Sequence, residues 1–390
     1  MNKKLFIIFV FFIIILIFFQ KGFILSSNYL IKDPNKEIKD IQDFININLD
    51  KTLYNKNYIF KRKIENPKIS IIITVYNGEG YIETALHSIQ NQDFKEIEII
   101  ILDDCSKDNS ISLIKQLMKN DYRISLYKNK ENKGMLYTKT QGVLKAKGKY
   151  ILILDVDDMY TQRNVFSTLF KEADKNNLDL LGFGGIISNI ALNRKSFINY
   201  LSTPILFQPD VSKTMYYHDS ENQIKRGYGG FLAFYFMKRE KLVRSINQIS
   251  KEFMNSKMNF HDDLLVYFIL SRNVNNLRQI RRIFYIVVDW ENNINSKMAF
   301  RLKEKNKNRE NIRCFSYIKY IQFILLNTNN TLYDKKIASF EIKRFYINHE
   351  CKNNTFTQNM GRNICQLFLK NQYIENKEKL LKNFLKAYTI

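Results

Sequence analysis

An unbroken apolar run that ends in a cluster of acids constrains the fold of this chain more than any other feature. Residues 150–154 are apolar, and Asp155, Val156, Asp157 and Asp158 follow directly. A continuous apolar run of this length is typical of a strand that is buried on both faces of a parallel sheet. Open α/β sheets bind their ligands at the carboxyl ends of such strands. The run therefore predicts a buried strand with a ligand site at its end.

The acids at the end of this run indicate a cation. Closely spaced carboxylates repel one another unless a positive charge neutralises them. A hard divalent ion takes oxygen ligands, and such an ion commonly carries a phosphate. The cluster therefore favours a metal-held phosphate or diphosphate, and the alternative is a solvated acidic turn.

Strands and helices are expected to alternate from Pro67 onward. Expected strands cover residues 69–75, 97–102, 124–127 and 150–154, and expected helices cover residues 81–90, 110–119 and 135–146. This alternation predicts βαβ units and a mostly parallel sheet. Right-handed crossovers then place every strand's carboxyl end on one edge.

Polar residues follow each of the first three strands as well as the fourth. They are Tyr76, Asn77, Gly78 and Glu79, then Asp103, Asp104, Ser106 and Asp108, then Asn132 and Gly134. Local turns and helix caps can account for some of them one at a time. Polar residues at four successive strand ends are better explained by one shared ligand site.

Composition bounds the remaining choices. A chain of 390 residues with 45% hydrophobic residues is long enough for one large domain with additions. Its net charge of +23 invites a nucleic-acid partner, but Lys, Asn and Ile are abundant throughout and no nucleic-acid signature accompanies the charge. We therefore expect a generally basic surface and no nucleic-acid partner. Four cysteines show no metal-ligand spacing, and a disulfide between Cys351 and Cys365 stays open.

The N-terminus has the pattern of a membrane segment. Residues 5–19 are entirely apolar after Lys3 and Lys4, and as a helix they would cover roughly 22 Å. That length falls within the range of a cleaved signal peptide, but residues 20–25 can extend the span with Lys21 reaching the interface. Because no small-residue cleavage site is evident, the sequence favours an uncleaved signal anchor at residues 5–25.

This anchor predicts a single-pass membrane protein. By the positive-inside tendency, residues 1–4 stay in the cytoplasm and the rest lies in the lumen of the Golgi or endoplasmic reticulum. Residues 26–66 are expected to be a stem, residues 67–296 the main domain and residues 297–390 a helical C-terminal extension. Acceptor patterns for N-glycosylation stand at Asn329 and Asn353.

Four segments at the strand ends carry a family resemblance. They are residues 71–79 (Ile-Ile-Ile-Thr-Val-Tyr-Asn-Gly-Glu), residues 99–108 (Ile-Ile-Ile-Leu-Asp-Asp-Cys-Ser-Lys-Asp), the set Asn132, Gly134, Thr138, Lys139, Thr140 and Gly142, and the pair Asp155 and Asp157. In this order and spacing they resemble family 2 glycosyltransferases of the GT-A fold, over roughly residues 67–160. A weaker resemblance continues to about residue 296, where His261-Asp262-Asp263 is similar to the family's Glu-Asp element and Asn295-Ser296 to its closing segment.

The resemblance implies a GT-A-like, Rossmann-type domain that binds a nucleotide-sugar donor, with a UDP-sugar favoured. It implies that the loop after the first strand borders the base and that Asp103 or Asp104 accepts a hydrogen bond from uracil N3–H. Asp157 and Asp155 would hold a divalent ion, Mn or Mg, against the diphosphate. The donor-binding residues expected from the resemblance are Thr74, Val75, Tyr76, Glu79, Asp103, Asp104, Asn132, Lys139 and Asp155.

Lys139 is a departure from the family pattern. The family's third loop usually runs Asn-x-Gly-x-x-x-Ala-Arg-Asn-x-Gly, so Lys139 stands where the family has Arg. Lysine keeps the charge but lacks the planar fork that binds two oxygens at once.

The resemblance also implies transfer with inversion to an acceptor hydroxyl on a glycan, protein or lipid. Inversion calls for a base, and Asp263 aligns with the family's base while Asp262 aligns with the acid before it. The competing interpretation makes Asp263 an N-cap for a helix that starts at Leu264. His261 is expected to be a structural neighbour, and the alternative is a contact with the acceptor.

Three other functions compete with this interpretation. A haloacid-dehalogenase-like phosphatase also uses an Asp-x-Asp strand end, but Met159 stands where it needs Thr, and the motif would follow its first strand. A nucleotidyltransferase is disfavoured because no Gly-rich phosphate loop lies near the first strand. A membrane-anchored binding module without transfer activity stays open, because residues 138–140 depart from the family pattern.

Overall fold

The computed structural model describes residues 58–189, 194–198, 203–208, 215–218, 224–226, 231–288 and single positions between 316 and 327. The expected anchor at residues 5–25, most of the stem, the closing segment Asn295-Ser296, Cys351, Cys365 and both glycosylation patterns lie outside these residues. So does nearly all of the expected extension at residues 297–390. In the part of the chain that is described, no helix is long and apolar enough to cross a membrane.

The first half of the domain is a run of strand–helix units. Its strands are β1 (Ile69–Val75), β2 (Ile97–Asp103), β3 (Ile124–Lys128) and β4 (Tyr150–Asp155), which pair in parallel in the order β3-β2-β1-β4. Its helices are α3 (Ile82–Gln90), α4 (Ser110–Met118) and α5 (Met135–Lys145). Each element agrees with its expected boundaries to within one residue, so the predicted alternation is confirmed here.

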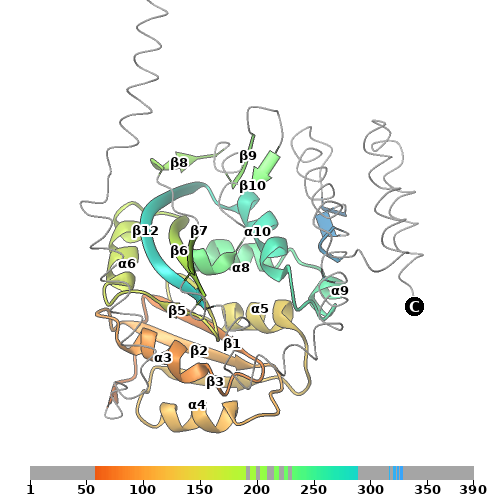
Figure 1. The fold of residues 1–390 in the computed structure, drawn as a ribbon. Helices are drawn as coiled ribbons and strands as arrows, with labels where there is room; N and C mark the ends of the chain where they lie inside the picture. Colours follow the sequence, from red (N-terminus) through yellow and green to blue (C-terminus); the bar gives the residue numbers. More distant parts are fainter. Residues whose placement is uncertain are drawn as a thin grey trace, which may run out of the picture.

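The strand order reverses beside β1. The chain steps from β1 to β2 to β3 in one direction and then returns past β1 to form β4. Because such crossovers are right-handed, α3 and α4 must lie on one face of the sheet and α5 on the other. Figure 1 shows this arrangement, with α5 on the side of α8 and α10. A crevice is expected outside the carboxyl ends of β1 and β4, where the direction reverses.

The second half extends the same sheet with mixed pairing. Strand β11 (Tyr235–Lys238) lies antiparallel between β4 and β6 (Leu180–Asn189), and β6 pairs in parallel with the long, curved strand β12 (Asn276–Val288) (Figure 1). Strand β12 also pairs with β5 (Met159–Tyr160) and β8 (Leu206–Phe207), and β7 (Arg194–Ile198) pairs with β6. A separate hairpin-like pair is formed by β9 (Tyr216–His218) and β10 (Ile224–Arg226).

The prediction of a mostly parallel sheet therefore holds for β1 to β4, but the pairing after them is mixed: β6 and β12 pair in parallel, and the pairs of β11, β5, β8 and β7 are antiparallel. Two parallel strands need a long crossover between them, usually a helix, whereas antiparallel strands do not. Residues 186–230 lie between most of β6 and β11 and show no regular helical period. The sequence pattern therefore could not indicate in which direction β11 runs.

The remaining described helices are α6 (Val165–Lys175), α8 (Arg239–Ile246), α9 (Lys251–Met254) and α10 (Asp262–Asn273), with a short 3-10 turn, η2 (Leu232–Phe234), before β11. Helix α10 is buried from Asp262 to Ser271, which fits a helix that is apolar on all sides. It packs against α5 and α8, and through them the second half covers one face of the first.

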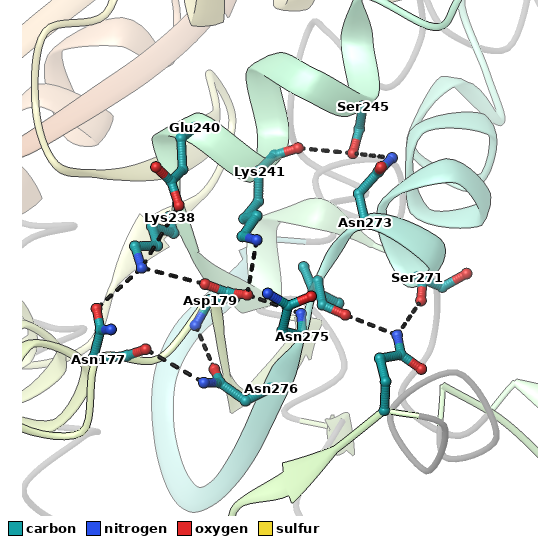
Figure 2. A network of polar contacts seen from close by, with 12 residues as sticks. Asn177, Asp179, Lys238, Glu240, Lys241, Ser245, Ser271, Asn273, Asn275 and Asn276 are labelled. Carbon is teal, nitrogen blue, oxygen red and sulfur yellow. Dashed lines mark hydrogen bonds and ion pairs between the residues drawn. The ribbon is translucent and has the colours of Figure 1, made fainter.

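The buried carboxylate of Asp179 connects several elements of the second half, and Figure 2 shows its polar contacts. These contacts lie near the start of β4, where Lys238 pairs with Tyr150, and so at the opposite end of that strand from its acids. Asp179, just before β6, accepts a hydrogen bond from the backbone N–H of Asn275 at 2.8 Å, and its own N–H donates to the side chain of Asn276 at 2.7 Å. Lys238 and Lys241 each approach its carboxylate to 3.4 Å. The starts of β6, α8 and β12 therefore depend on one charged side chain.

We predict that Asp179→Ala lowers the free energy of unfolding by about 2 kcal/mol, because it removes the acceptor of the Asn275 N–H and the buried carboxylate that Lys238 and Lys241 approach. Urea unfolding of the purified protein measures the change. Asp174→Ala is the matched control: its ion pair with Lys149 is about half exposed, so its loss should cost less than about 1 kcal/mol. Equal effects of the two substitutions would contradict this assignment.

Candidate active site

The carboxyl ends of β1, β2 and β4 bring the predicted acid loops to one edge of the sheet. Thr74 of β1 lies beside Asp155 of β4, and Val75 lies beside Asp103 of β2. Val75 is buried and Tyr76 is 46% exposed, so the chain emerges into solvent just past the end of β1. This is the edge at which the strand order reverses.

Reciprocal hydrogen bonds hold the first two of these loops together. The backbone N–H groups of Asn77 and Glu79 donate to Ser106 Oγ and Asp108 Oδ2, at 2.9 and 3.0 Å. In return, the Glu79 carboxylate accepts two hydrogen bonds from Asn109, at 2.9 and 3.2 Å. Glu79, which was expected to bind the donor, thus fixes the entry to α4 in this structure.

The acids after β2 hold the third loop. Asp104 Oδ1 accepts from Asn129 Nδ2 and the Lys133 N–H, both at 2.8 Å, and Oδ2 accepts from the Gly134 N–H at 2.9 Å. Asn132 Nδ2 donates to the Asp104 carbonyl at 3.4 Å. Asp103 is fully buried and accepts from the Ser106 N–H. Both carboxylates are thus engaged in fastening loops, in the positions where the resemblance implied a uracil contact.

Gly134 is required where this loop enters α5. Its φ is +86°, and a Cβ there would lie 2.8 Å from the carbonyl carbon of Lys257. The Leu136 N–H also donates to the Met258 carbonyl at 3.1 Å. Close backbone approach therefore docks the start of α5 against the segment that leads into α10.

The three acids after β4 have different roles. Asp158 is buried and accepts from Tyr285 Oη at 2.9 Å and from the Val288 N–H at 3.1 Å, which fastens the loop to β12. The Tyr285 hydroxyl also accepts from the Asp155 N–H at 3.2 Å. Asp157 is exposed. Of the three, Asp157 is the exposed one and Asp155 is partly exposed, so a ligand can approach both.

One carboxylate oxygen of Asp155 has no hydrogen-bond partner in the described part of the chain. Among the described residues, neither its Oδ1 nor the neighbouring Thr74 Oγ1 has a hydrogen-bond partner, although both atoms are buried. Burial raises the pKa of Asp155, and Lys139 opposes that rise. Buried polar atoms without a partner are rare and call for an explanation such as a bound ion or water.

This donor set fits a divalent ion that shares its shell with a ligand. In the described segments, no three His, Cys, Asp or Glu side chains are grouped closely enough to hold an ion on their own. Mg²⁺ is commonly held by only one or two carboxylates together with substrate phosphates. Asp157 and the unpartnered oxygen of Asp155 suit that arrangement.

Lys139 lies buried between the acids of α10 rather than open to solvent. Its Nζ is 2.5 Å from Asp263 Oδ1 and 2.8 Å from Asp262 Oδ2, and the residue is only 4% exposed. Asp263 Oδ2 accepts from the Leu232 N–H at 3.1 Å. Burial lowers the pKa of Lys139, but Asp262, Asp263 and Asp155 outweigh it and hold that pKa well above its usual value.

The pKa of Asp263 lies near neutral pH. Burial raises its pKa to about 7, with Lys139 opposing the rise and the negative charges of Asp262 and Asp155 adding to it. A base with its pKa near the working pH is well suited to proton transfer. Because the charge of Asp155 raises the pKa of Asp263, the end of β4 and the start of α10 belong to one electrostatic cluster.

Helix α10 does not begin as it would if Asp263 were its N-cap. The helix begins at Asp262, two residues before the expected start, and its N-cap is His261, in the left-handed region with φ of 59°. Asp263 therefore lies within the first turn and bonds to Leu232 and Lys139, so the N-cap interpretation of Asp263 is wrong.

Sequence reasoning missed the partners of Lys139, although a signal was present. Lys139 lies three residues after Leu136 and four before Val143, both buried in α5. A lysine at helical spacing with apolar residues predicts a buried ammonium, which needs a carboxylate partner.

Comparison with known sequences supports the family resemblance. Residues 70–242 match the family described as Glycosyl transferase family 2. The GalNAc(5)-diNAcBac-PP-undecaprenol beta-1,3-glucosyltransferase of Campylobacter jejuni is 38% identical over 130 residues, which cover 33% of this chain and 40% of that protein. A glycosyltransferase of Haemophilus influenzae is 41% identical over 92 residues, which cover 24% and 37%. The chain thus spans two fifths or less of the length of these relatives.

Solved structures show the same fold. S. aureus TarS residues 1–349 in complex with UDP superpose with a TM-score of 0.51 at 16% identity, over 83% of this chain and 81% of that one. The complex with UDP-GlcNAc gives a TM-score of 0.52 at 16% identity, over 82% and 81%. The matched sequences are thus glycosyltransferases, and the described fold resembles that of TarS.

We predict that Asp104→Asn lowers the free energy of unfolding by about 1–3 kcal/mol. An amide nitrogen cannot accept, so at least one N–H of the third loop is left buried without a partner. Glu79→Gln is the control, because Glu79 is exposed and its substitution should change stability by less than about 0.5 kcal/mol. Urea denaturation distinguishes them, and an unchanged midpoint for Asp104→Asn would refute the scaffolding role.

Proposed function

We propose that this protein transfers a sugar from a UDP-sugar donor to an acceptor hydroxyl, with inversion at the anomeric carbon. The observation that carries the proposal is the cluster in which Lys139 pairs with Asp262 and Asp263, the acids that begin α10, and interacts electrostatically with Asp155 at the end of β4. A donor site and a proton acceptor must lie side by side for direct transfer. The family match and the UDP and UDP-GlcNAc complexes of TarS support the choice of donor.

The donor would bind across the carboxyl ends of β1 and β4. The exposed Tyr76 and the adjoining backbone border the base, and Asp155 and Asp157 face the diphosphate. A divalent ion, Mn or Mg, would be held by these two carboxylates and would neutralise negative charge on the leaving diphosphate. Thr74 Oγ1, buried beside Asp155 without a partner, offers a further polar contact at the same point.

Asp263 would take the proton of the acceptor hydroxyl. As the proton moves to the Asp263 carboxylate, the acceptor oxygen forms its bond to the anomeric carbon, and the bond from that carbon to the diphosphate oxygen breaks. Attack from the face opposite the leaving group inverts the carbon. Water can replace the natural acceptor, so hydrolysis of UDP-GlcNAc provides an assay that needs no knowledge of the acceptor.

Membrane attachment through residues 5–25 is part of the proposal, and only the apolar pattern of the sequence supports it. A binding module without transfer activity is the alternative outcome. It would bind UDP with metal and yet release no sugar from any UDP-sugar.

We predict that Asp157→Asn weakens binding of UDP in the presence of Mn²⁺ by roughly 10-fold or more, a loss of about 1.4 kcal/mol or more. The substitution keeps the size of the side chain but removes a charged ligand of the ion. Calorimetry with UDP and Mn²⁺ measures the effect, and Asp174→Asn, a half-exposed acid remote from the loops, is the control. Undiminished affinity in Asp157→Asn would remove this residue from its role.

We predict that turnover depends on a group with a pKa near 7. Below that pH Asp263 holds a proton and cannot accept another, so turnover should fall about tenfold per pH unit, and above it turnover should level off. Asp263→Asn should lower turnover on the order of 100-fold and abolish this dependence. The measurement is UDP-GlcNAc hydrolysis from pH 5.5 to 8.5. Near-wild-type turnover of Asp263→Asn would eliminate the base assignment.

A further inference from the structure

The carboxylate of Asp263 is held at both oxygens by groups from two other elements. Lys139 of α5 contacts Oδ1 at 2.5 Å, and the Leu232 N–H of η2 donates to Oδ2 at 3.1 Å. A carboxylate oxygen offers two lone-pair sites, so each oxygen keeps one for a further partner. The plane of the carboxylate is thus set before any substrate arrives.

Lys139 also balances the charge of the cluster. Asp262, Asp263 and Asp155 all act on it, and it is the cation that opposes the mutual repulsion of these acids. If the ammonium were absent, several carboxylates would share a buried space, and at least one would take up a proton at neutral pH. The lysine therefore bears on whether Asp263 is ionised as well as on where it points.

These contacts leave the Lys139 ammonium little capacity to bind the donor. Two of its three N–H directions point to Asp262 and Asp263, and the residue is 4% exposed. To reach a diphosphate it would have to leave both acids buried without their counter-charge, which is strongly unfavourable. A compact ammonium also suits two separate carboxylates better than a planar guanidinium, whose fork favours one carboxylate.

We propose that Lys139 is a positioning residue for the acceptor side of the site: it orients the Asp263 carboxylate and keeps it charged, and it does not bind the nucleotide-sugar. This role rests on the proposed function, in which Asp263 is the base. It replaces the donor contact that the resemblance implies for this position.

The test is Lys139→Met, which keeps an unbranched side chain of similar length and removes the charge. In UDP-GlcNAc hydrolysis we expect turnover at pH 7 to fall roughly 100-fold, while the KM for donor and the Kd for UDP with Mn²⁺ stay within about twofold. The midpoint of the pH profile should move upward, because Asp263 loses the cation that holds its pKa down. Lys139→Arg should restore the midpoint toward the wild-type value.

A second variant guards against misfolding of Lys139→Met. Asp262→Asn keeps the lysine and removes one negative charge beside Asp263, so the midpoint should move downward. Opposite shifts in the two variants support the proposal, because a purely structural defect would lower activity without shifting the midpoint in opposite directions.

Two results would overturn the proposal. One is a Lys139→Met variant whose Kd for UDP with Mn²⁺ rises 10-fold or more while its pH midpoint is unchanged, which is the behaviour of a donor-binding residue. The other is an unchanged midpoint in Asp262→Asn.

A readout that needs no activity separates this proposal from the proposed function. The carboxyl ¹³C signal of Asp263, assigned by its loss in Asp263→Asn, reports the titration directly by NMR. If the wild-type protein neither binds UDP nor hydrolyses any UDP-sugar, the proposed function fails. The titration then still decides the charge-holding role of Lys139: an upward shift in Lys139→Met supports it, and an identical curve rejects it.

Discussion

The ion cluster around Lys139 is the interaction on which the geometry of this site depends. One ammonium from α5 contacts two carboxylates at the start of α10 and acts on a third at the end of β4. Buried charges are costly unless they are paired, so each partner requires the others to be in place. Because α5 belongs to the first half of the domain and α10 to the second, this pairing fixes how the two halves meet near the carboxyl ends of β1 and β4.

Several of the acids that follow the strands build the loops. Asp104, Asp108 and Asp158 each accept hydrogen bonds from backbone N–H groups of neighbouring loops or strands. Their carboxylates take the place of regular secondary structure in a region that must stay irregular. Two features differ from these loop-building acids at the point where the strand order reverses: the Asp157 side chain is exposed, and Asp155 Oδ1 has no hydrogen-bond partner among the described residues.

Much of the first half could be predicted from sequence, because its strands are continuous apolar runs and its helices have a clear period. Strands β5, β11 and β12 were not predicted: β5 and β11 have only two and four residues, and the first half of β12 carries charged residues that interrupt any apolar pattern. The motifs indicated the edge of the sheet at which these residues gather, but they could not distinguish Glu79 and Asp104, which fasten loops, from Asp155 and Asp157. The pairing of Lys139 with Asp263 joins residues 124 positions apart, and no local rule contains it. The lysine on the apolar face of α5 was the one indication available.

The central claim is that a metal-held UDP-sugar binds beside Asp155 and Asp157 while Lys139 stays with Asp263. A crystal structure with Mn²⁺ and UDP, with the metal located by its anomalous scattering, tests both parts at once. The account predicts an anomalous peak within coordination distance of the Asp157 carboxylate and of the diphosphate, with the Lys139–Asp263 contact intact. A metal or nucleotide bound away from the ends of β1 and β4, or a Lys139 side chain turned toward the diphosphate, would contradict it.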